Sequence, residues 1–227
     1  MILENDASFK SAAREQESLL TPLEKKALLW LAHRMPVWVS PDHLTALGLL
    51  GMTLAGVCYC LARWSPFALL GSILFLFVNW FGDSLDGTLA RVRQRQRPRY
   101  GFYVDHMVDT FGALFLIGGL GLSGFMTGVV ALALLIAYFM LLIEIYLATY
   151  TVGVFKLSYG IWGPTELRMV LSIGTLAVLA KPIVRICGSP YFLCDIGAVV
   201  AIAAMSVILL TSVVRNTLRL YDEERLQ

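Results

Sequence analysis

The stretch that decides the fold is residues 82–110, GDSLDGTLARVRQRQRPRYGFYVDHMVDT, which holds four aspartates and five arginines. It lies between two strongly apolar runs, SPFALLGSILFLFVNWF at 65–81 and TFGALFLIGGLGL at 110–122. Charges gathered between two such runs are typical of two membrane helices joined at one face of a bilayer. The stretch therefore predicts two antiparallel, neighbouring helices whose acidic ends lie at a similar depth near one membrane surface.

The composition of the whole chain is that of a polytopic membrane protein. Its 227 residues are 58% hydrophobic and 15% charged, and the mean hydropathy is +0.72, far more apolar than an average soluble domain. A helix needs about 20 apolar residues to cross a hydrocarbon core. The candidate spans are 44–62, 66–90, 102–122, 126–150, 167–184 and 191–214. We therefore predict an all-α membrane protein with six transmembrane helices.

The chain before the first span predicts a separate surface helix. Thr21, Pro22 and Glu24 supply an N-cap, a first-turn proline and a capping-box acid. Apolar residues then recur on one face, so this helix is expected to lie in the membrane interface. The predicted organisation is a polar N-terminal tail (1–20), an interfacial amphipathic helix (21–40), a six-helix domain (41–218) and a cytoplasmic C-terminal tail (219–227).

The distribution of basic residues predicts the orientation. With both termini in the cytoplasm, all but three of the 18 Lys and Arg residues lie on the cytoplasmic side, as the positive-inside rule requires. The three outside are Arg63, Lys181 and Arg185. The arginine-rich loop is then cytoplasmic. We interpret four of its arginines as orientation and lipid-attraction signals, namely Arg93, Arg95, Arg97 and Arg99.

The four aspartates predict a metal site. Asp83 and Asp86 are three residues apart and Asp105 and Asp109 are four apart, so each pair projects from one face of its helix. Converging carboxylates repel one another, and some would protonate without a counter-charge. Oxygen ligands without His or Cys favour hard divalent cations over zinc. We predict Mg²⁺ or Mn²⁺, with two ions.

Small residues and an arginine beside the acids predict a phosphate-bearing ligand. Gly87, Ala90 and Gly101 leave a bare strip where a ligand can approach the backbone, and Arg91 is suited to a phosphate oxygen. Metal and arginine together at a cytoplasmic cleft are typical of phosphoryl transfer. Membrane carboxylates also serve ion and proton pathways, so a cation- or proton-coupled transporter is the alternative from another class. Clustering at one membrane face favours the enzyme.

The pattern Asp83-x-x-Asp86-Gly87-x-x-Ala90-Arg91, followed by Gly101-x-x-x-Asp105-x-x-x-Asp109, resembles that of the CDP-alcohol phosphotransferase (phosphatidyltransferase) family. The resemblance implies a six-helix core, often preceded by an interfacial helix. It also implies transfer of a phospho-alcohol group from a CDP-alcohol to a second hydroxyl, with release of CMP, in phospholipid biosynthesis. In that family the aspartates hold divalent metal, the small residues make room for the nucleotide, and the arginine contacts phosphate. The last aspartate, here Asp109, is assigned as the base.

Two details resemble the choline and ethanolamine branch of that family. His106 directly follows Asp105, and TYTVGVFKLSYGIWGPTELR at 149–168 resembles the corresponding branch segment. The resemblance implies CDP-choline or CDP-ethanolamine as donor and a diacylglycerol-like acceptor. It also implies that His106 and Glu166 together provide the catalytic base. Histidine can accept a proton near neutral pH. Glu166 is alternatively a helix-start acid stabilised by the helix dipole. The alternative within the family is a phosphatidyltransferase that uses CDP-diacylglycerol and a small alcohol.

The remaining predictions concern the acceptor and partners. Glu144 and Tyr146 are candidates for the acceptor pocket, and Lys156 and Arg168 for binding a phosphate on an acceptor. The glycines of GGLGLSG at 118–124 permit close helix packing, which is compatible with a homodimer. We expect a membrane-bound protein with its site on the cytoplasmic side and no nucleic-acid partner.

Overall fold

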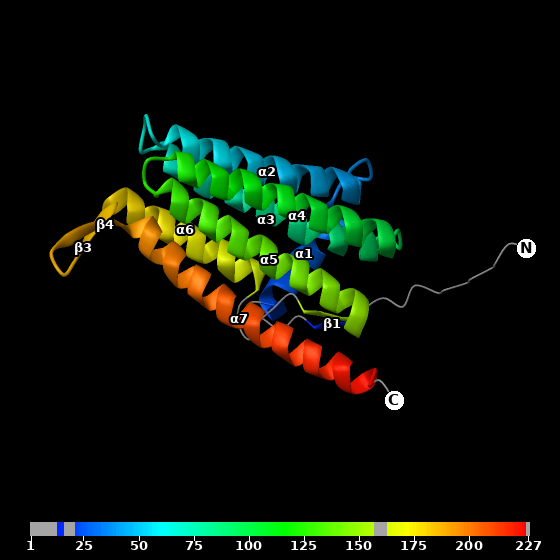
Figure 1. Cartoon of the computed structure of the whole chain (residues 1–227). Helices are drawn as coiled ribbons and strands as arrows, with labels where there is room; N and C mark the ends of the chain where they lie inside the picture. Colours follow the sequence, from blue (N-terminus) through cyan, green and yellow to red (C-terminus); the bar gives the residue numbers. More distant parts are fainter. Residues whose placement is uncertain (1–12, 16–20, 157–162, 226–227) are drawn as a thin grey trace, which may run out of the picture.

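The computed structural model describes residues 13–15, 21–156 and 163–225, and its long helices lie side by side (Figure 1). The helices are α1 (Thr21–Arg34), α2 (Pro41–Leu61), α3 (Ala68–Val92), α4 (Pro98–Leu122), α5 (Gly128–Val152), α6 (Pro164–Ala180) and α7 (Leu193–Glu223). The strands are β1 (Ala13–Glu15), β2 (Val154–Lys156), β3 (Ile183–Ile186) and β4 (Ser189–Phe192). The mostly helical architecture predicted from the sequence is confirmed, and the short strands are an addition to it.

Four helices in the described part of the chain are long and apolar enough to cross a membrane. They are α2, α3, α5 and α7. Helix α4 is also 25 residues long, but its first half carries Asp105, His106 and Asp109. Helix α6 has only 17 residues, slightly fewer than a perpendicular span needs. These helices support an integral, multi-pass membrane protein.

The four strands form two small sheets. Strand β1 pairs in parallel with β2, and β3 pairs antiparallel with β4. The β3–β4 hairpin turns through Cys187 and Gly188, whose φ angles of 49° and 85° are both positive, as a tight two-residue hairpin turn requires. The hairpin lies between α6 and α7, where Pro182 follows the end of α6 and prevents the helix from continuing.

Close backbone packing joins α2 to α3. An ideal Cβ at Gly51 would lie 2.7 Å from the Asn79 backbone nitrogen, and one at Gly82 would lie 2.5 Å from the Leu44 carbonyl oxygen. Neither position has room for a larger residue. The side-chain amide of Asn79 also donates to the Gly48 carbonyl oxygen at 2.9 Å. This hydrogen bond fixes the position of α3 along the axis of α2, and with it the position of the acidic end of α3.

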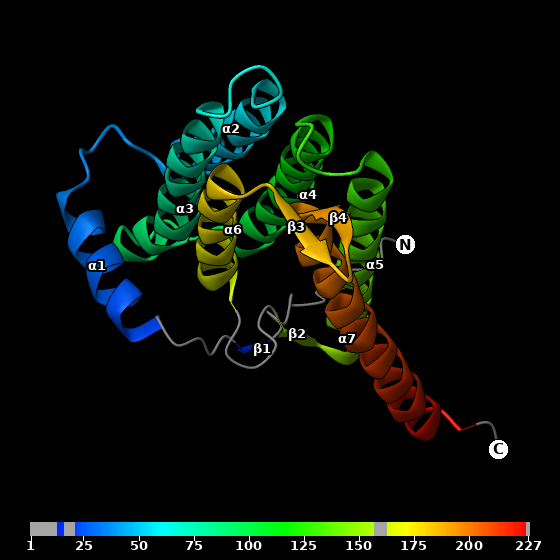
Figure 2. The same cartoon turned by 90° about the vertical axis from the view of Figure 1, so that its left-hand side faces the viewer.

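Helix α2 packs against α4 as well as against α3 (Figure 2). Gly56 on α2 and Gly119 on α4 bring the two backbones into contact, so a side chain on either would clash. The main neighbour of both acid-bearing helices is therefore α2, rather than each other as the sequence predicted. Because α2 holds both helices, it controls how far apart their aspartates lie.

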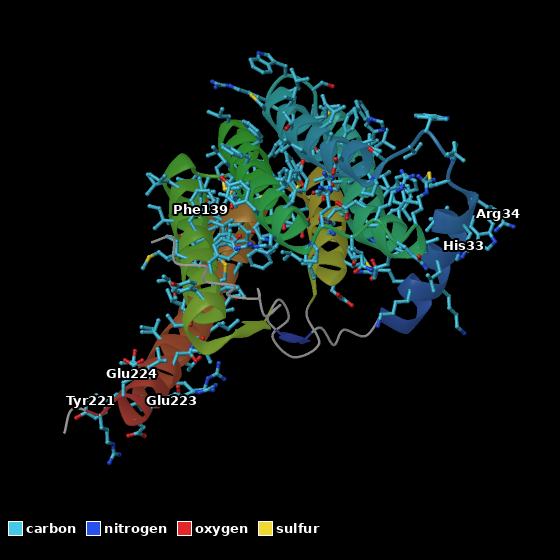
Figure 3. The ribbon with its side chains drawn as sticks, turned by 90° about the vertical axis from the view of Figure 1, so that its right-hand side faces the viewer. His33, Arg34, Phe139, Tyr221, Glu223 and Glu224 are labelled. Carbon is cyan, nitrogen blue, oxygen red and sulfur yellow. The ribbon has the colours of Figure 1, made fainter. Side chains whose placement is uncertain are left out.

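Helix α1 packs on the last turns of α3. Leu28 and Ala32 are buried in one apolar cluster with Leu85 and Leu89, while Trp30 on the other face is 55% exposed. The face of α1 that covers α3 is therefore that of Leu28 and Ala32, and the interfacial position predicted for 21–40 stays a prediction. At the end of α1, His33 and Arg34 point away from the bundle (Figure 3).

Helix α7 is longer than its apolar segment. It continues through the charged residues to Glu223, and Arg219 pairs with Glu223 at 2.8 Å within its last turns. Figure 3 shows Tyr221, Glu223 and Glu224 at its far end. The segment predicted as a C-terminal tail thus begins as the end of a helix.

Candidate metal and phosphate site

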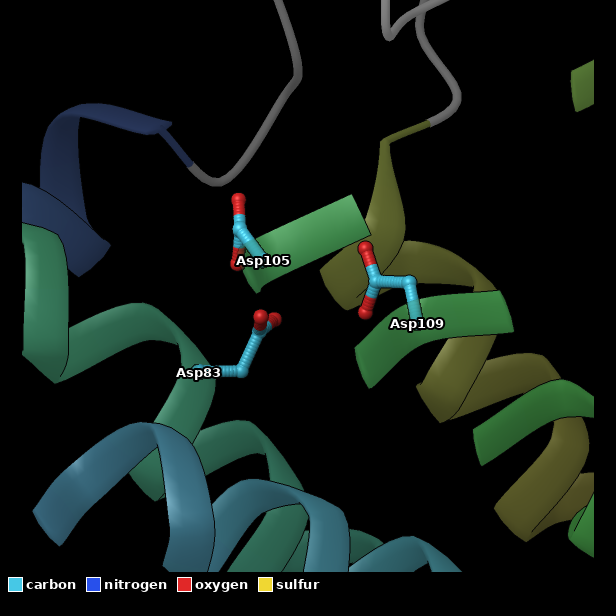
Figure 4. Close-up of side chains that lie close together, drawn as sticks. All are labelled: Asp83, Asp105 and Asp109. Atoms are coloured by element: carbon cyan, nitrogen blue, oxygen red, sulfur yellow. The ribbon is translucent and has the colours of Figure 1, made fainter. Parts of the chain in front are cut away.

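Three carboxylates from two helices meet at one point. Asp83 on α3 and Asp105 and Asp109 on α4 each offer an oxygen, and these oxygens all lie within 4.8 Å of one another (Figure 4). All three residues are half-buried. Repulsion among three carboxylates this close is relieved by a hard cation, and an all-oxygen donor set fits one. The residues present therefore fit a divalent metal ion.

Asp86 lies outside this group of three. Its Oδ2 accepts a hydrogen bond from the Thr45 hydroxyl of α2 at 2.6 Å, and its Oδ1 accepts one from the Gly87 backbone N–H at 2.5 Å. Asp86 is therefore held between α3 and α2 by two donors. The spacing in the sequence placed it with the other three, but the contact with Thr45 depends on tertiary packing.

Arg168 of α6 supplies a positive charge inside the cluster. Its Nη2 lies 2.5 Å from Asp83 Oδ2, and its Nε donates to Asn79 Oδ1 at 2.7 Å. Its Nη1 is buried and has no hydrogen-bond partner among the described residues. The guanidinium thus contacts one carboxylate of the cluster while one of its donors is left for a ligand.

Asn79 connects this guanidinium to α2. Its side-chain oxygen accepts from Arg168 and its side-chain nitrogen donates to the Gly48 carbonyl oxygen. Asn79 was not among the predicted site residues, although an amide one turn before Asp83 in an apolar run was an available signal. Arg168 was selected, but only as a contact for an acceptor phosphate.

The predicted strip of small residues is open in part. A Cβ at Gly101 would meet no atom within 4 Å, whereas one at Gly87 would meet the Arg91 guanidinium at 3.7 Å. Arg91 donates to the Thr88 hydroxyl at 3.1 Å, so its side chain lies back along α3. Ala90 is half-buried on the same helix. Space for a ligand is therefore clearest at the start of α4.

His106 is buried beside the acids. Its Nδ1 lies 2.6 Å from the Phe102 carbonyl oxygen, its ring stacks on Phe102 with centroids 4.2 Å apart, and Tyr146 meets it edge-on at 5.2 Å. A carbonyl oxygen can only accept, so a neutral ring carries its proton on Nδ1. The nitrogen able to accept a proton is then Nε2.

Glu166 lies in the first turn of α6. Its Oε2 accepts a hydrogen bond from the Gly163 backbone N–H at 3.1 Å, which is the contact of a helix-start acid. This contact matches the second of the two interpretations given for Glu166. Glu166 lies two residues before Arg168 on the same helix.

Glu144 and Tyr146 point to different neighbours of α5. Glu144 Oε1 accepts from Ser212 and Asn216 of α7, both at 2.8 Å, whereas Tyr146 contacts His106 of α4. The two residues therefore do not share one pocket wall. Lys156 lies in β2, and its side chain lies outside the described part of the structure.

Two arginines of the arginine-rich loop contact other parts of the chain, through hydrogen bonds or an ion pair. The Arg93 guanidinium donates to the carbonyl oxygens of Met35 at 3.0 Å and Pro36 at 2.8 Å. Arg97 pairs with Asp42 at the start of α2. The interpretation of these two arginines as orientation and lipid signals alone is therefore incomplete. Arg93 also holds the connection between α1 and α2 against the end of α3, and Arg97 joins the residue before α4 to the start of α2.

The sequence matches the family described as CDP-alcohol phosphatidyltransferase over residues 38–214. Cholinephosphotransferase 1 of Gallus gallus is 32% identical over 117 residues, which cover 49% of this chain and 34% of that relative. Cholinephosphotransferase 1 of Xenopus laevis is 33% identical over 105 residues, which cover 44% of this chain and 26% of the relative. The matched part thus spans about a third or less of these curated relatives.

Proposed function

Because this chain belongs to the CDP-alcohol phosphatidyltransferase family, we propose that it transfers a phospho-alcohol group from a CDP-alcohol to a lipid hydroxyl and releases CMP. The proposed donor is CDP-choline or CDP-ethanolamine and the proposed acceptor is a diacylglycerol-like lipid. The similarity to cholinephosphotransferases supports this choice. The observation that carries the proposal is the meeting of Asp83, Asp105 and Asp109 within 4.8 Å.

The proposed metal ligands are the four aspartates of the pattern, Asp83, Asp86, Asp105 and Asp109. Three of them already converge, and Asp86 is one helical turn from Asp83. When bound, Mg²⁺ or Mn²⁺ supplies positive charge that withdraws electron density from the diphosphate of the donor. Two ions are proposed because four carboxylates carry enough negative charge for two divalent cations.

The proposed phosphate contacts are Arg168 and Arg91. A buried donor without a partner costs about 1–3 kcal/mol, so the buried Nη1 of Arg168 favours an anionic ligand at this point. A guanidinium can bind two phosphate oxygens at once. The open space at Gly101 is the proposed position of the nucleotide, next to Asp105 on the same helix face.

The proposed reaction moves one proton and exchanges one bond at phosphorus. The acceptor O–H loses its proton to His106 Nε2 or to Asp109, and the alkoxide oxygen bonds to the phosphorus nearer the donated alcohol. The bond from that phosphorus to the bridging oxygen breaks, and CMP leaves with that oxygen. Glu166, at the start of α6, is proposed as the acid that accompanies His106 in the site, while the ring of His106 is oriented by the contact of its Nδ1 with the Phe102 carbonyl oxygen.

The proposed topology has six spans with the site facing the cytoplasm. In this arrangement α4 and α6 also cross the membrane, and α1 lies at the cytoplasmic interface. The arginine-rich loop between α3 and α4 then lies next to the aspartates on the cytoplasmic side. A water-soluble CDP-alcohol would enter from that side, and a lipid acceptor from the bilayer.

The test is a donor and acceptor matrix with the purified protein and Mn²⁺ or Mg²⁺. We expect CMP with CDP-choline or CDP-ethanolamine plus diacylglycerol. CMP formed only from CDP-diacylglycerol plus a small alcohol would instead assign the phosphatidyltransferase branch. No CMP from any pair, together with ion-dependent flux in sealed vesicles, would overturn the enzyme and support a transporter.

A further inference from the structure

One carboxylate outside the aspartate cluster joins three helices beside it. Glu24 of α1 accepts hydrogen bonds at Oε1 from Trp80 Nε1 at 2.8 Å, from Ser84 Oγ at 3.3 Å and from Thr165 Oγ1 at 2.8 Å. Trp80 and Ser84 belong to α3, and Thr165 belongs to α6. A single oxygen of the surface helix thus receives donors from two helices of the bundle.

The donors to Glu24 lie next to the residues of the site. Ser84 directly follows Asp83 in the sequence, and Thr165 precedes Arg168 by one helical turn. The same two helices meet again where Arg168 contacts Asp83 at 2.5 Å. Helices α3 and α6 are therefore linked through Arg168, which contacts both Asp83 and Asn79 of α3, and again through Glu24.

We propose that Glu24 is a positioning residue, which sets the spacing of α3 and α6 and thereby holds Asp83 in place for the metal ion and Arg168 in place for a phosphate of the ligand. This inference rests on the proposed function, since it takes the aspartate cluster as a metal site. Hydrogen bonds to a carboxylate are among the stronger ones in proteins. Helix α1 is itself held on α3 by the buried Leu28, so the backbone of Glu24 has a fixed position relative to α3.

The hydrogen bonds to Glu24 suggest a conservative variant. All three donors reach Oε1, and the amide of Gln keeps one carbonyl oxygen that can accept the same bonds. Leu has a similar size and no acceptor. Glu24→Gln should therefore preserve the spacing of α3 and α6, whereas Glu24→Leu should release it and leave the donors of Trp80 and Thr165 without this partner.

The test is direct Mn²⁺ binding, measured by electron paramagnetic resonance on the purified full chain in lipid nanodiscs. Loss of residues that support metal ligands typically lowers metal affinity roughly 10- to 100-fold. We expect Glu24→Leu to weaken Mn²⁺ binding by about tenfold and Glu24→Gln to bind within about twofold of the wild type. Tyr59→Phe is the matched control, because it removes the bond between Tyr59 and Thr175 that joins α2 to α6 elsewhere. Its Mn²⁺ affinity should not change.

Four results would overturn the inference. A folded Glu24→Leu protein with wild-type Mn²⁺ affinity would refute it while leaving the proposed function intact, and so would a Glu24→Gln protein as weak as Glu24→Leu. A wild-type protein that binds no Mn²⁺ would refute the metal site and the inference together. Should Glu24→Leu not fold, Thr165→Val removes only the donor of α6, and unchanged Mn²⁺ affinity in that variant would equally refute the role.

Discussion

At the scale of single residues, the aspartate cluster already contacts a positively charged side chain, that of Arg168. Arg168 contacts Asp83, and a divalent metal ion bound by the same carboxylate would compete with it. The pair is largely buried, with 12% of the Arg168 side chain and 21% of the Asp83 side chain exposed. Removing one partner of a buried pair leaves the other charge without compensation and costs about 3 kcal/mol or more.

This competition predicts the behaviour of Arg168→Met. Without metal, the variant should melt at a lower temperature than the wild type, because Asp83 loses its counter-charge. Mn²⁺ should then raise its melting temperature by more than it raises that of the wild type, since no guanidinium competes for Asp83. Thermal melting in detergent with and without Mn²⁺ measures both effects. Arg168→Lys, which keeps the charge, serves as control, and equal Mn²⁺ shifts in wild type and Arg168→Met would contradict the prediction.

At the scale of helices, α2 is the element on which the site depends, because α3 and α4 both pack on it. The contact with α4 is a direct approach of two backbones at Gly56 and Gly119. The neighbouring Gly118 faces open space, and a Cβ there would meet no atom within 4 Å. Two adjacent glycines of one helix therefore differ completely in their surroundings.

These adjacent glycines provide a matched pair of variants. Gly119→Ala should destabilise the protein by about 1–3 kcal/mol, because the new methyl group overlaps the α2 backbone. Gly118→Ala should be neutral or stabilising by up to about 1 kcal/mol, since alanine favours the helix. The fraction that remains folded on heating in detergent distinguishes the two. Equal stability of both variants would show that α2 and α4 do not approach as closely as described.

The elements were predictable from local pattern to different degrees. The span predicted at 126–150 is α5 (Gly128–Val152) and that at 44–62 is α2 (Pro41–Leu61), because long apolar runs with clear breakers define such helices. The β3–β4 hairpin was missed, since a short apolar run does not distinguish a strand from a helix end. The end of α7 was misplaced because hydropathy marks where a helix leaves the membrane, not where its hydrogen bonds stop.

The site was predictable only where its residues are close in sequence. The spacing within each pair predicted that Asp83 and Asp86, and Asp105 and Asp109, project from one face of their helix, and three of these four acids meet. The contacts of Arg168 and Glu24 were not predictable in this way. They join residues 85 and 60 positions apart, such as Arg168 with Asp83 and Glu24 with Ser84, and no local periodicity reports a contact between separate helices.

At the scale of the whole molecule, the two ends of the bundle differ in chemistry. Figure 1 shows the β3–β4 hairpin at one end and the C-terminus at the other. The exposed Cys187 lies in the turn of that hairpin, while the arginine-rich loop follows α3 at the acidic end. If the proposed topology holds, these two ends lie on opposite sides of the membrane.

Cysteine labelling tests this arrangement. A membrane-impermeant maleimide should label Cys187 in intact cells, because the hairpin would face outward. A Gln96→Cys substitution in the arginine-rich loop, made together with Cys187→Ser, should be labelled only after the membrane is permeabilised. Labelling of the loop cysteine in intact cells, with Cys187 protected in the wild type, would reverse the proposed orientation.

The most direct measurement of the central claim is CMP release by purified Asp109→Asn, with CDP-choline, diacylglycerol and Mn²⁺ as for the wild type. Asp195→Asn is the control, because Asp195 bonds to Thr127 at the other end of the bundle. We predict that Asp109→Asn, though folded, releases CMP at least roughly 100-fold more slowly, as expected on losing a metal ligand or base, and that Asp195→Asn keeps most of the wild-type rate. Wild-type CMP release by a folded Asp109→Asn protein would contradict the proposal that the aspartate cluster carries out the reaction.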